Sequence, residues 1–92
     1  MNLHFINVLD VIERAKQSIV ANSDNESYAS MLGDLVEKFK RQLSEDLGLS
    51  EELLFPIDPA AEKHPDVEKL YQEGFMLSSE AEKLYWEVDS SI

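Results

Sequence analysis

Acidic residues recur at a fixed interval in the last third of the chain. Four of them are separated by seven positions each: Asp66, Glu73, Glu80 and Glu87. In a helix this interval returns side chains to nearly the same face, at a spacing of about 10.5 Å. A second row beside the first holds Glu68, Glu82 and Asp89. Repeated carboxylates repel one another and attract cations, so the chemistry that this pattern predicts is electrostatic binding of a basic surface.

The charge of the whole chain agrees with this interpretation. The 92 residues contain 8 Lys and Arg against 19 Asp and Glu, a net charge of −11. Residues 42–92 alone hold thirteen acids and three bases. This excess argues against direct binding to nucleic acid or to an anionic membrane surface, because both need cations on the protein.

Aromatic side chains accompany the acids. Half of the eight aromatic residues lie within a stretch of sixteen: Tyr71, Phe75, Tyr85 and Trp86. Aromatic side chains anchor protein interfaces while charges steer the partner. The expected partner-binding residues are therefore Asp66, Glu73, Glu80, Glu82, Glu87, Tyr85 and Trp86. Two other interpretations remain open: the acids form a solvated face that keeps the protein soluble, or they pair with the cationic cluster of Lys38, Lys40 and Arg41.

Patterns for catalysis, metal binding and cofactor binding are absent from the sequence. There is no His-Glu-x-x-His, Glu-x-x-His or calcium-loop motif, and there is no cysteine. The three glycines are too scattered to form a phosphate-binding loop. His64 lies between Glu62 and Asp66, but Pro65 disfavours a helical metal site there, so we expect His64 to be a helix cap or a surface residue. The sequence predicts a protein that is not an enzyme and needs no metal or cofactor.

Three helical patterns predict the elements that position these residues, over residues 3–20, 24–47 and 65–90. In the first pattern, apolar residues spaced by three and four form one stripe: Phe5, Val8, Ile12, Ala15 and Ile19. Ser23 and Glu26 have the spacing of a capping box at the start of the second helix. Gly33 costs helix stability and predicts a close approach of another helix. Gly48 is a typical C-terminal stop.

The third pattern is the most regular one. Its apolar positions follow spacings of three and four without interruption: Val67, Leu70, Gly74, Leu77, Ala81, Leu84 and Val88. This is a heptad seam of the kind found in coiled coils. Residues 48–64 are expected to form an ordered connector with one short turn capped by Ser50, and with Leu53, Leu54, Phe55 and Ile57 pointing inward.

The sequence thus predicts a single all-α domain over residues 1–92: a three-helix bundle made of an antiparallel hairpin, an ordered proline-containing connector and a long C-terminal helix. The expected function is that of a non-catalytic inhibitor or adaptor that docks a basic protein surface. Its most specific forms are an imitation of nucleic-acid charge aimed at a nuclease or nucleic-acid-binding protein, and a toxin-neutralising immunity protein. The alternative is a structural subunit that forms a homodimer through the heptad seam. With no signal peptide or membrane span in the sequence, we expect a cytoplasmic protein.

Overall fold

All secondary structure elements in the described part of the chain are helices. The computed structural model describes residues 7–55 and 64–92. The helices are α1 (Val8–Ala21), α2 (Glu26–Leu47), α3 (Glu51–Leu54), α4 (Pro65–Glu73) and α5 (Ser79–Ser91). The all-α class is confirmed. The expected three-helix bundle is not confirmed, because these residues form five helices.

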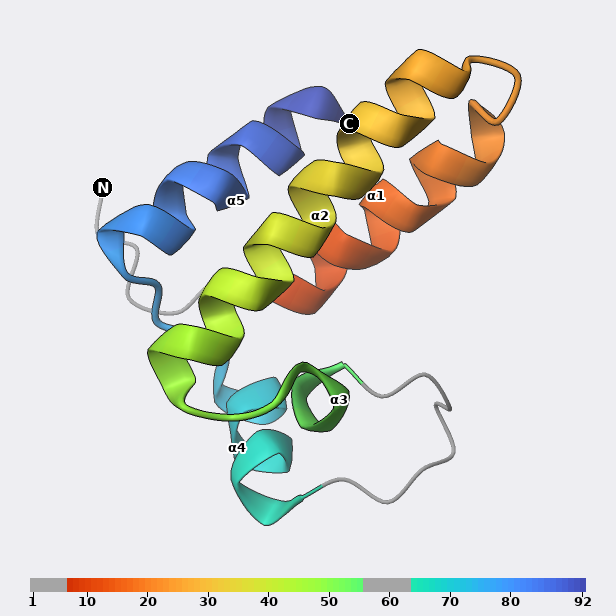
Figure 1. The fold of residues 1–92 in the computed structure, drawn as a ribbon. Helices are drawn as coiled ribbons and strands as arrows, with labels where there is room; N and C mark the ends of the chain where they lie inside the picture. Colours follow the sequence, from red (N-terminus) through yellow and green to blue (C-terminus); the bar gives the residue numbers. More distant parts are fainter. Residues whose placement is uncertain (1–6, 56–63) are drawn as a thin grey trace.

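Helices α1, α2 and α5 lie side by side, and α3 and α4 lie together near the C-terminal end of α2 (Figure 1). Contacts at both ends of α5 show that it runs antiparallel to α2. The Tyr28 hydroxyl, near the start of α2, donates to the carbonyl of Ser91 at the end of α5. The Ser78 hydroxyl, just before α5, donates to Oδ2 of Asp46 at 2.5 Å, near the end of α2. None of the helices in residues 7–55 and 64–92 is long and apolar enough to cross a membrane.

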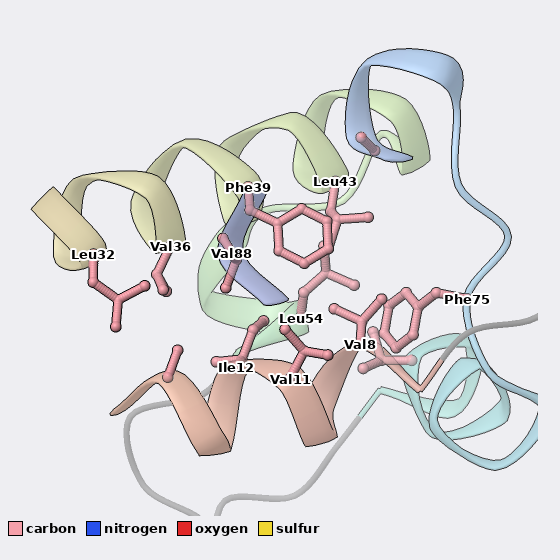
Figure 2. Close-up of a cluster of buried hydrophobic side chains, with 13 residues drawn as sticks. Val8, Val11, Ile12, Leu32, Val36, Phe39, Leu43, Leu54, Phe75 and Val88 are labelled. Atoms are coloured by element: carbon pink, nitrogen blue, oxygen red, sulfur yellow. The ribbon is translucent and has the colours of Figure 1, made fainter. Parts of the chain in front are cut away.

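One apolar core lies between these helices. Side chains of α1 and α2 point toward each other, with Val88 of α5 among them (Figure 2). The stripes expected in the first and third helical patterns supply six of the thirteen buried apolar residues, as expected of amphipathic helices. The buried apolar residues are Val8, Val11, Ile12, Ala15, Leu32, Val36, Phe39, Leu43, Leu54, Val67, Phe75, Ala81 and Val88.

The boundaries of α2 are set by local capping. Its N-cap is Asn25, whose side chain accepts a hydrogen bond from the amide of Tyr28 at 3.2 Å. The expected capping box of Ser23 and Glu26 is therefore wrong, and asparagine is an equally favourable N-cap. Gly48 ends the helix in the left-handed conformation, at φ 67° and ψ 24°, as its position predicts. Gly33 has nothing within 4 Å of where a Cβ would stand, so the expected close approach is not formed.

The predicted helix over residues 65–90 is interrupted between Glu73 and Ser79. Gly74 ends α4 with φ 90° and ψ 178°, a backbone region that is essentially restricted to glycine. Ser78 then begins α5, because its hydroxyl accepts from the amide of Ala81 at 3.2 Å. The interruption allows Phe75 to enter the core, where it is 1% exposed. Burial of a large aromatic ring offsets the loss of a few helical hydrogen bonds.

The connector follows the prediction in part. Ser50 caps α3 by accepting from the amide of Leu53 at 3.3 Å. Leu54 is fully buried and Phe55 is half-buried. Leu53, however, is 43% exposed, so its expected inward position is wrong. A helix of one turn can direct only part of its surface to the core. Ile57 lies outside the described residues.

Candidate partner-binding surface

The interruption after α4 divides the predicted row of acids between two helices. Asp66 and Glu73 belong to α4, whereas Glu80, Glu82 and Glu87 belong to α5. Figure 1 shows α4 beside α3, away from the axis of α5. A single straight row of carboxylates is therefore wrong, because the row needs one continuous helix to keep its spacing.

The acids of α5 lie on both of its flanks. Leu84 lines a hollow with Lys38 and Arg41 of α2, which identifies the flank that faces α2. Glu80 and Glu87 lie four residues before and three residues after Leu84, so they share this flank.

The opposite flank of α5 faces α1. Asp89 pairs there with Arg14 of α1 at 2.9 Å. Glu82 lies seven residues before Asp89 and shares this flank, where it is half-buried. The α5 acids are thus presented in two directions and not as one line.

Three of the four acids in the predicted row have no ion pair. Within the described residues, Glu73, Glu80 and Glu87 are exposed and none has a Lys, Arg or His nitrogen within 4.0 Å. Asp66 has one, because His64 Nδ1 lies 3.8 Å from its carboxylate, a pair that is charged only when the imidazole is protonated. Within the described residues, these three carboxylates therefore have no ion-pair partner.

The cationic cluster of α2 forms no ion pair with the row among the described residues. Lys40 pairs with Glu37 of its own helix at 3.8 Å, and its ammonium nitrogen lies 5.5 Å from the centre of the Phe55 ring. Lys38 and Arg41 form no ion pair within the described residues. The expected pairing of this cluster with the row is not formed in this structure.

The two aromatic residues of α5 differ in their exposure. Tyr85 is half-buried, with its ring at an edge-to-face angle to Phe39, 6.0 Å between centroids. Burial raises the pKa of the Tyr85 hydroxyl, as does the nearby charge of Asp89, while Arg14 lowers it. Tyr85 therefore belongs largely to the core edge and has little surface for a partner.

Trp86 is the accessible aromatic residue. It is 37% exposed and meets the Tyr85 ring edge-to-face at 5.1 Å. With Leu35, Glu87, Ser90 and Ser91 it lines a shallow hollow of about 390 Å³ between α2 and α5. An indole fixed by a neighbouring ring and open on one side is a suitable interface anchor.

The acids of α4 lie beside an apolar groove that the sequence pattern did not reveal. His64 caps α4 as expected, accepting from the amide of Asp66 at 3.2 Å. The groove is lined by Asp66, Lys69, Leu70 and Glu73 of α4, by Leu47 at the end of α2 and by Leu49 just after that helix. The heptad pattern had assigned Leu70 to a buried seam, whereas it is half-buried here. The leucines on either side of Gly48 were the available signal.

The described residues hold no group of three or more His, Asp or Glu side chains that could bind a metal ion. Comparisons of this chain with protein families, with curated proteins and with solved structures find no match. The function must therefore be inferred from the surface itself.

Proposed function

We propose that this chain is a non-catalytic binding protein, an inhibitor or adaptor that docks a basic surface of a protein partner. The observation that supports this most directly is a set of exposed acids that form no ion pair among the residues that the structure describes, Glu73, Glu80 and Glu87. A cationic partner would relieve their mutual repulsion and would be attracted over a distance of several ångströms. A nuclease or a nucleic-acid-binding protein has such a surface, which the acids would engage in place of phosphates.

The exposed indole supports a specific contact in addition to this long-range attraction. Trp86 lies next to Glu87, so an apolar anchor and a charge are available on the same turn of α5. Anchors of this type contribute most of the binding energy in many interfaces, whereas exposed charges mainly raise the association rate.

The alternative, a homodimer formed through the heptad seam, has less support. Val67, Ala81 and Val88 of that seam are fully buried within the chain's own core. A second copy would reach them only after α4 and α5 had left their present positions. The net charge of −11 would also repel a second copy at low ionic strength.

Charge reversal on α5 tests the proposed function. The variant Glu80→Lys/Glu87→Lys should capture much less of any basic partner from a host extract at low salt than the unchanged chain does. The matched control is Glu13→Lys/Asp24→Lys, which makes the same change in net charge at exposed positions outside α4 and α5. Equal capture by both variants would show that the α5 acids have no specific role.

Trp86 provides a second measurement, because it is the only tryptophan in the chain. A partner that docks on α5 should change its fluorescence emission, and Trp86→Phe should weaken the complex. Binding with unchanged emission would place the partner elsewhere and contradict the α5 site.

A further inference from the structure

We infer that the groove between the end of α2 and α4 binds a cationic segment of a protein partner that also carries apolar side chains. This inference rests on the proposed function and specifies which element of the partner is recognised. It concerns α4 and the end of α2, whereas the tests above address α5.

The groove combines an apolar floor with a charged rim. Leu47, Leu49 and Leu70 are half-buried against the core and leave one side open. The hollow above them has a volume of about 360 Å³. Asp66 and Glu73 stand at its rim, and the Asp66 side chain is 78% exposed. An apolar surface of this kind accepts leucine-like side chains, and its polar rim determines which partner can approach.

The surroundings of the groove are strongly acidic. Residues 45–52 and 64–73 together hold seven acids and a single base, Lys69. The C-terminal end of α2, which has no basic residue in its last turn, adds the negative end of a helix dipole. An anionic lipid surface, a nucleic acid or a second copy of this acidic chain would be repelled here. A cationic peptide segment fits the charge and the apolar floor together.

The spacing of Asp66 and Glu73 determines how far apart the matching cations of the partner must lie. Asp66 and Glu73 are two helical turns apart, which is about 10.5 Å. Lys69 lies between them on the same face of α4. The matching segment therefore has two cations about 10 Å apart with a non-cationic residue between them, which corresponds to arginines seven positions apart in a helix.

A pair of synthetic peptides tests this pattern against the full chain. The first is a helical peptide of about 15 residues, long enough to form helix, with arginines seven positions apart and leucines between them on the same face. The second has the same composition with the arginines moved to the face opposite the leucines. Binding is followed by the amide resonances of the isotope-labelled protein. We expect the first peptide to bind more tightly and to shift Leu49, Lys69 and Leu70.

Two matched double variants keep the side-chain shapes and remove charge. Asp66→Asn/Glu73→Gln should weaken binding of the first peptide roughly fivefold at low salt, the effect of two exposed ion pairs. Glu80→Gln/Glu87→Gln removes the same charge from α5 and should leave binding nearly unchanged.

Four results would overturn this inference. The two peptides could bind equally, both variants could weaken binding equally, or the resonance shifts could be confined to α5. The last result would leave the proposed function standing. Concentration-dependent shifts at Leu49 and Leu70 without any peptide would show that a second copy occupies the groove, and would also overturn the inference.

Discussion

The guanidinium of Arg14 lies 2.9 Å from the carboxylate of Asp89 and joins the middle of α1 to the end of α5. Arg14 also lies 3.9 Å from Asp10 on its own helix. One cation thus serves two carboxylates at the boundary between α1 and α5. The pairing also withdraws Asp89 from the second acidic row, so this position is unsuited to contact a partner.

Removal of this ion pair should reduce stability by a small amount. The side chains of Arg14 and Asp89 are 48% and 31% exposed, so water and salt screen their attraction. We expect Arg14→Gln to lower the free energy of unfolding by about 0.5 kcal/mol. Urea denaturation of Arg14→Gln, Asp89→Asn and the double variant measures the coupling. A coupling that does not decrease at high salt would show that packing, and not charge, is responsible.

Substitution of two glycines by alanine should have opposite effects on stability. Gly33→Ala should raise the free energy of unfolding by about 0.5–1 kcal/mol, because alanine favours helix and no atom lies within 4 Å of the added methyl group. Gly48→Ala should lower it by about 1 kcal/mol, because its φ of 67° is unfavourable for a residue with a Cβ. Thermal unfolding compares the two directly. A destabilised Gly33→Ala variant would mean that another helix does approach α2 there.

The hydroxyl of Tyr85 should make stability depend on alkaline pH. Its pKa is raised in the folded chain above the ordinary value of 10.0, mainly by burial and also by Asp89. The folded protein then retains a proton that the unfolded chain has lost. The protonated Tyr85 hydroxyl therefore makes its full contribution to the free energy of unfolding below pH 10.0. This contribution declines as the pH rises through the folded pKa.

Comparison with Tyr85→Phe isolates this contribution. The unfolding free energy of the unchanged chain should fall more steeply above pH 10.0 than that of the variant. Tyrosinate absorbance gives the folded pKa independently. Parallel pH profiles for the two proteins would be inconsistent with a raised pKa at this residue.

Gly74→Ala should disrupt the join between α4 and α5. Only glycine adopts φ 90° with ψ 178° without strain, so we expect a loss of about 1–3 kcal/mol in the free energy of unfolding. The strain is relieved if the backbone at position 74 becomes helical, so the helical content measured by circular dichroism should not fall. Unchanged stability would mean that the turn has another conformation.

The sequence predicted the helices wherever local chemistry alone decides their bounds. Apolar spacing identified α1 and α2, Gly48 marked the end of α2, and His64 with Pro65 marked the start of α4. The join at Gly74 was missed because the spacing of three and four continues through it without a change. The missed signal was a glycine followed four residues later by a serine, which is a stop and a start in succession.

The candidate surface was predicted by residue type and not by arrangement. The exposed acids and Trp86 could be recognised from composition and spacing. Their division between α4 and α5, and the groove beside Leu70, depend on where Phe75 is buried. Burial of a residue outside the regular stripe is a tertiary effect that no local pattern contains.

The conformation of the backbone at Gly74 bears on both functions considered for this chain, the binding protein and the homodimer. With the backbone bent there, Val67, Ala81 and Val88 of the heptad pattern are buried inside one molecule, and Glu73, Glu80 and Glu87 are exposed at its surface. Straightened, the same residues would form an elongated rod, with an apolar edge suited to lengthwise pairing with a twin and with Phe75 brought to the outside. A methyl group at position 74 would disfavour the bent backbone, because φ 90° with ψ 178° is essentially restricted to glycine.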